Sequence, residues 1–81
     1  MKVYEIQIHK PGNVVHDLDS ALDRAEREHR ERLCVRVSTP EARREVLSVM
    51  NRWAGEPVML EGSAIFSFAC TPSRRISVQV E

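Results

Sequence analysis

The sequence lacks a net charge. Twelve Lys and Arg residues balance twelve Asp and Glu residues, so no bulk electrostatic attraction draws the chain to DNA, RNA or an anionic membrane. It also lacks a secretory signal, an apolar run of membrane length and a CxxC motif. These absences favour a soluble, cytoplasmic protein in a reducing environment, and we expect no disulfide between Cys34 and Cys70.

Motifs of catalysis are missing as well. There is no GxGxxG or GxxxxGK[ST] loop and no Ser/His/Asp order at a nucleophile elbow. His9 and His16 flank a short loop, but a metal site needs three or four ligands, so we expect neither a metal nor a cofactor. Asp17, Asp19 and Asp23 fall in the first turns of a predicted helix, where the helix dipole explains them without acid–base chemistry. The absence of these motifs favours a domain that is not an enzyme.

What is present is the composition of one small folded domain. Of the 81 residues, 42% are hydrophobic and 30% are charged, which suits a modest core rather than a disordered chain. The segment 32–58 holds the clearest pattern. Its first residues alternate in polarity, which predicts a half-buried strand. The inward set is Leu33, Val35 and Val37, and the outward set is Cys34 and Arg36.

A helix is predicted directly after this strand. Ser38 or Thr39 can cap it, and Pro40 fits its first turn, where a missing N–H costs nothing. Glu41 stands three residues after Ser38, as a capping box requires. Gly55 should end the helix. The apolar positions expected to face the core are Ala42, Val46, Val49, Met50 and Trp53.

The segments on either side complete the predicted layers. A first strand is expected over 2–9, and a loop at Pro11, Gly12 and Asn13 leads to a helix over 17–30 that can start as early as Asn13. Three i,i+4 ion pairs are expected on that helix. They are Asp23 with Arg27, Glu26 with Arg30, and Glu28 with Arg32.

The C-terminal part predicts a hairpin. Residues 58–60 are a short strand candidate, and residues 64–70 and 75–80 alternate in polarity around a turn at 71–74. Cys70 shares the inward face with Phe66 and Phe68, so a buried, inert thiol is expected there.

The element order predicts an α/β (α+β) two-layer sandwich, β-α-β-α followed by two or three strands. Residues 1–81 then form one domain with a mixed sheet and both helices on one face. The other face of the sheet should be open. Its predicted residues are Glu5, Gln7, Cys34, Arg36, Ser67, Ser77 and Gln79.

Several of these residues resemble the TusA/SirA-like family of small sulfur-carrier proteins. The stretch LCVRVSTPEARREV resembles the family's second strand, turn and helix start, including Glu45-Val46, and the stretch from Gly55-Glu56 to Val58 resembles its route into the third strand. In that register, Lys10-Pro11-Gly12-Asn13 falls where the family carries Cys-Pro-x-Pro. Pro11 matches the first proline. Lys10 replaces the sulfur-carrying cysteine, and Asn13 replaces the second proline.

A lysine cannot form a persulfide, so the resemblance implies a family fold without the family's thiol. The predicted function is therefore a protein-binding module, a thiol-less member of a sulfur-relay or redox assembly. Its expected binding residues are Lys10, Pro11, Asn13 and Arg36. Its expected partner is a sulfurtransferase or a redox protein, with a homodimer as the other option.

Two alternatives remain open. The first is a sulfur carrier using Cys34, whose thiol would have to be exposed and reactive, with the Arg36 guanidinium favouring the thiolate. The second is a nucleic-acid-binding domain, because similar layers occur in Alba-like and initiation-factor-like domains. That function would require Lys2, Lys10, Arg74 and Arg75 to form one basic patch.

Overall fold

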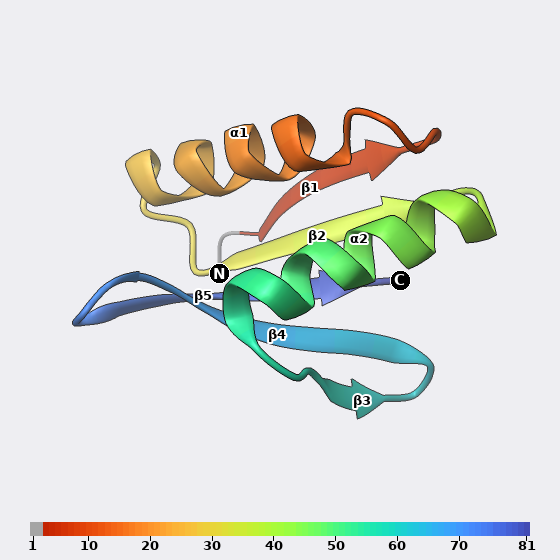
Figure 1. Cartoon of the computed structure of the whole chain (residues 1–81). Coiled ribbons are helices and arrows are strands. Elements are labelled where there is room, and N and C mark those ends of the chain that lie inside the picture. The colour runs from red at the N-terminus through yellow and green to blue at the C-terminus, as the bar shows by residue number, and fades with distance from the viewer. Residues whose placement is uncertain (1–2) are drawn as a thin grey trace.

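The computed structural model describes residues 3–81 and shows a five-stranded mixed sheet with two helices on one face (Figure 1). Lys2, at the start of the predicted first strand, lies outside the described residues. The elements in chain order are β1 (Val3–Ile8), α1 (Val14–Arg27), β2 (Arg32–Val37), α2 (Pro40–Ala54), β3 (Val58–Leu60), β4 (Ser63–Thr71) and β5 (Arg74–Val80). The predicted two-layer α+β sandwich is confirmed, and the short strand candidate is formed, so three strands follow α2.

The strand order explains which face is covered. The sheet runs β1-β2-β5-β4-β3, with β1, β2 and β5 parallel and with β4 antiparallel to both β5 and β3. A parallel neighbour needs a crossover connection, and α1 supplies it between β1 and β2. Figure 1 shows α1 and α2 side by side on the same side of the sheet, which leaves the other side without a second layer.

The core fills the space between the helices and the sheet. Its members are at most 5% exposed and come from every element except β3. The helices contribute Val14, Leu18, Ala21, Leu22, Ala25, Ala42, Val46, Val49 and Met50, and the strands contribute Ile8, Leu33, Val35, Ala64, Phe66, Ile76, Val78 and Val80. Trp53, expected in this core, is instead 37% exposed. It lies in the last turn of α2, and Phe68 and Cys70 on the helix side of β4 are also only half-buried.

The start of α2 confirms most of the predicted signals. The Ala42 N–H donates to Thr39 Oγ1 at 3.2 Å, and Pro40 occupies the first turn. The expected capping box of Ser38 and Glu41 is wrong, because the cap is Thr39 and the Ser38 hydroxyl lies 3.0 Å from His9 Nδ1 instead. Gly55 ends the helix with φ at 82°, a conformation that suits glycine.

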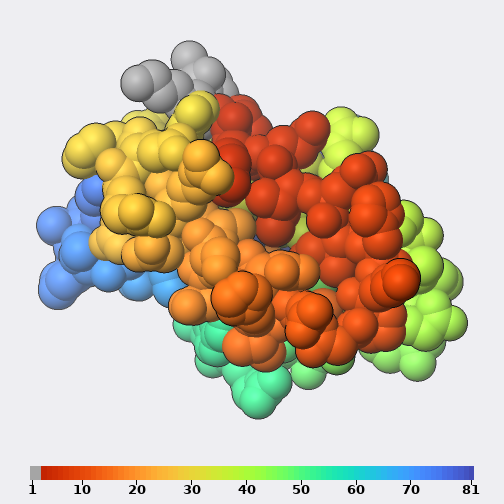
Figure 2. All heavy atoms as spheres, turned by 90° about the horizontal axis from the view of Figure 1, so that it is seen from above, coloured from red at the N-terminus to blue at the C-terminus, as the bar shows by residue number. Residues whose placement is uncertain are grey.

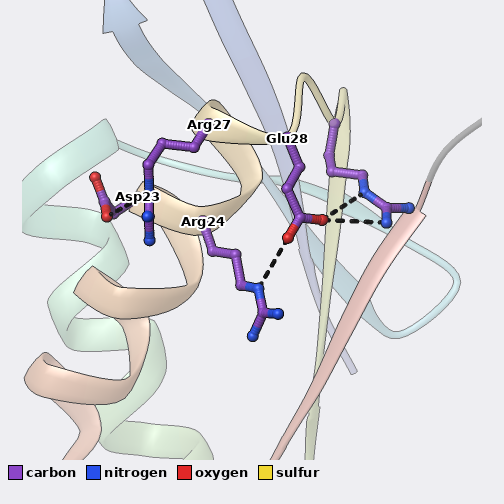
Figure 3. Close-up of polar contacts among 5 residues, drawn as sticks. Asp23, Arg24, Arg27 and Glu28 are labelled. Atoms are coloured by element: carbon purple, nitrogen blue, oxygen red, sulfur yellow. Dashed lines mark hydrogen bonds and ion pairs between the residues drawn. The ribbon is translucent and has the colours of Figure 1, made fainter.

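The end of α1 differs from prediction. The helix begins at Val14, one residue after the earlier expected start at Asn13, but it ends at Arg27, and His29 has φ at 57°. Residues 28–32 therefore lose helical spacing, and two of the three predicted ion pairs are wrong. Asp23 does pair with Arg27, at 3.1 Å. Glu28 accepts instead from Arg24 at 2.9 Å and from Arg30 at 3.2 Å (Figure 3). The bond to Arg24 is the main cause that lowers the pKa of Glu28.

Candidate functional site

The open face of the sheet is ordered in rows that cross all the strands. Pairing places Val58 beside Ile65, Ile65 beside Gln79, Gln79 beside Cys34, and Cys34 beside Glu5. Directly opposed residues point to the same face of a sheet. The row therefore passes from apolar side chains at β3 and β4 to polar and charged ones at β1 and β2.

Apolar side chains are concentrated on this face more than the sequence analysis expected. Val58 is 67% exposed, Leu60 is 57% exposed and Val3 is 45% exposed, while Ile65 is half-buried. We call these four residues the open-face patch. Val3, Leu60 and Ile65 line a groove of about 330 Å³. Val3 and Ile65 occupy positions that the alternation in the sequence assigns to the open face. This alternation is the sequence signal from which the apolar character of the face could have been predicted.

Arg36 lies on the open face as predicted. Its guanidinium Nε donates to Glu5 Oε2 at 3.1 Å, across the β1–β2 pair. Both side chains are more than half exposed, so the pair adds little stability. The ion pair orients the Arg36 side chain toward Glu5 on β1.

Cys34 also lies on the open face but is only 8% exposed. Its thiol donates to Glu81 Oε2 at 3.4 Å. Burial is the largest cause that raises the pKa of Cys34, and the Glu81 carboxylate adds to it. Arg36 acts in the expected direction, toward the thiolate, but it is outweighed. The structure therefore meets neither condition for a carrier that uses Cys34, which are exposure and a stabilised thiolate.

The loop with the predicted binding residues follows the end of β1, beside the end of β2 that carries Arg36. Lys10, Pro11 and Asn13 are exposed and lead from β1 to α1, toward the helix side of the sheet. The loop is held by the Gly12 N–H, which donates to Glu45 Oε1 at 3.0 Å. Of the four predicted binding residues, Arg36 lies on the open face, and the other three lie in the loop between β1 and α1.

Cys70 is half-buried rather than buried; it lies near the end of β4, and this end of the strand extends beyond the end of α2 (Figure 1). Burial is the main cause that raises its pKa, with a smaller contribution from Glu26. Cys34 and Cys70 are both free thiols and lie on opposite faces of the sheet, which agrees with the expectation of no disulfide.

The basic patch required for nucleic-acid binding does not assemble within residues 3–81. Lys10 follows the end of β1, whereas Arg74 and Arg75 begin β5, which runs parallel to β2 and so starts at the opposite end of the sheet. About ten residue steps separate them along the strands, on the order of 30 Å. Arg75 is further engaged with Ser67 Oγ at 2.7 Å. Lys2 lies outside the described residues.

Within residues 3–81, no group of three His, Cys, Asp or Glu side chains is placed to hold a metal ion. No helix in the same range is both long and apolar enough to cross a membrane. Comparisons with protein-family models, curated proteins and solved structures found no match.

Proposed function

We propose that this domain is a protein-binding module that docks its partner on the open face of the sheet. The observation that supports this most is the open-face patch, Val3, Val58, Leu60 and Ile65, on a sheet face that neither helix covers. Single exposed apolar residues are ordinary, but Val3, Leu60 and Ile65 line one groove, which indicates a docking surface.

The layout of the face suits a partner with apolar groups opposite β3 and β4 and polar groups opposite β5, β2 and β1. Val58, Leu60 and Ile65 lie on β3 and β4, Val3 lies on the opposite edge strand β1, and Glu5 and Arg36 lie on β1 and β2. Aliphatic side chains supply burial, while the charges select the orientation of the partner.

The TusA/SirA-like resemblance supplies the partner class, a sulfurtransferase or a redox protein. In this proposal the domain takes the docking role of a carrier without carrying sulfur. Lys10 stands in the carrier position, and the buried, protonated Cys34 thiol does not replace a carrier thiol.

A rhodanese-type sulfurtransferase serves as the first probe, with binding measured by titration calorimetry. Leu60→Glu and Arg36→Glu should each weaken binding about tenfold without unfolding the domain, because both side chains are exposed. Val15→Glu is the matched control, since Val15 is 52% exposed on α1, away from the open face.

Equal binding by all three variants would place the docking surface elsewhere. No binding by the wild type would reject this partner class. The docking surface itself is then tested by quantitative capture of proteins from a cell extract. Recovery of the same partner by Leu60→Glu as by Val15→Glu would overturn it.

A further inference from the structure

A second groove lies on the helix side of the sheet, apart from the open face. It forms because α2 ends at Ala54 while the β4–β5 hairpin continues beyond it (Figure 1). Ala64 and Phe66 are fully buried under the helices, whereas Phe68 and Cys70, further along the same face of β4, are only half-buried. Seen from above, the end of α2 and the hairpin emerge beside the C-terminal half of α1 (Figure 2).

The groove has an apolar floor with an exposed aromatic ring. Its volume is about 430 Å³, and its apolar lining is Leu22, Trp53, Phe68 and Cys70. Trp53 is 37% exposed even though it continues the apolar face of α2. An indole left accessible beside a second aromatic ring offers a flat surface for stacking.

The rest of the lining is acidic. Asp19, Asp23 and Glu26 stand on one side of α1, and no Lys or Arg lines the groove. Within residues 3–81, Asp19 and Glu26 have no ion-pair partner, while Asp23 pairs with Arg27 at 3.1 Å. Figure 3 shows Asp23 on the flank of α1 nearer to α2. Arg74 approaches but donates to the backbone carbonyl of Glu26, at 3.4 Å, rather than to its carboxylate.

The spacing of the carboxylates indicates the shape of the ligand. Positions 19, 23 and 26 extend over about 10 Å of helix, and no three such groups are placed to hold one metal ion within the described chain. Alternate residues of an extended peptide repeat every 6 to 7 Å on one side. A segment with two basic side chains in an R-x-R pattern therefore matches the acidic rim.

We propose that this groove binds an arginine-containing extended segment of a partner protein. A guanidinium can stack on Trp53 and Phe68 and donate hydrogen bonds to the carboxylates at the same time, whereas an ammonium is a compact point charge that is more strongly hydrated. The floor buries the aliphatic stem of the arginine. This site is distinct from the open-face patch and does not depend on it.

Trp53 is the only tryptophan of the chain, so its fluorescence reports on the groove directly. Titration with a short R-x-R peptide should change its emission saturably, and higher salt should weaken the binding. The double variant Asp19→Asn/Glu26→Gln should bind about five- to tenfold more weakly. Its matched control is Glu41→Gln/Glu61→Gln, which removes two exposed carboxylates outside the groove and should bind like the wild type.

Equal affinity of the two double variants would overturn the site. Equal affinity for a K-x-K peptide would overturn its assignment to arginine. Leu60→Glu should leave the peptide titration unchanged, which separates failure of this site from failure of open-face docking. Loss of peptide binding in Leu60→Glu would show that the peptide binds the open face instead.

Discussion

Replacing Leu18 by Ala should destabilise the domain far more than the same replacement at Leu60. Leu18 on α1 is fully buried in the core, whereas Leu60 on β3 is 57% exposed. Removing a buried leucine side chain costs about 2–5 kcal/mol, because burial is lost and a cavity remains. The same change at an exposed position costs roughly 0.5 kcal/mol or less.

These magnitudes are large for a chain of 81 residues. Small domains have unfolding free energies of about 0.05–0.15 kcal/mol per residue, or roughly 4–12 kcal/mol here. A loss of about 3 kcal/mol at Leu18 should lower Tm by roughly 12–24 °C, since 1 kcal/mol corresponds to about 4–8 °C in a domain of this size.

Urea unfolding followed by circular dichroism measures both variants against the wild type. The slope with urea should stay constant, so that the midpoints report stability. If Leu18→Ala and Leu60→Ala differ by less than about 0.5 kcal/mol, α1 does not pack on the sheet as described.

Three further predictions concern the cap, the thiols and pH. Thr39→Ala should cost about 1 kcal/mol in urea unfolding, because the Ala42 N–H loses its acceptor; an unchanged midpoint would contradict the cap. A persulfide donor should add no mass to the native protein, because Cys34 is buried and burial raises the pKa of both Cys34 and the half-buried Cys70; a labile adduct that disappears in Cys34→Ala would show a working carrier. The pKa of Cys34 is raised in the fold, so its contribution to stability is complete below the unfolded thiol pKa of about 8.5 and is lost as pH rises through the folded pKa. Urea midpoints should thus fall more steeply above about pH 8.5 in the wild type than in Cys34→Ala, and parallel profiles would contradict this.

Local patterns in the sequence determined the elements and their faces. Alternation in 33–37 assigned Leu33 and Val35 to the core and Cys34 and Arg36 to the other face, and the structure confirms this. A strand has a side-chain period of two, so its faces can be read without its neighbours. Thr39, Pro40 and Gly55 similarly mark helix ends through contacts within a few residues.

Burial and surface grouping were decided by the tertiary structure. Trp53 fits the apolar period of α2 but lies where the helix ends, so its exposure depends on what lies beneath that turn. Cys34 was assigned to the open face correctly, yet Glu81, 47 positions away, accepts a hydrogen bond from its thiol. Lys10 and Arg74 were separated by the parallel course of β1, β2 and β5. Each of these features depends on contacts or distances between segments that are far apart in the sequence. The periodicity of one segment predicts which face a residue occupies, but it does not predict what packs against that face.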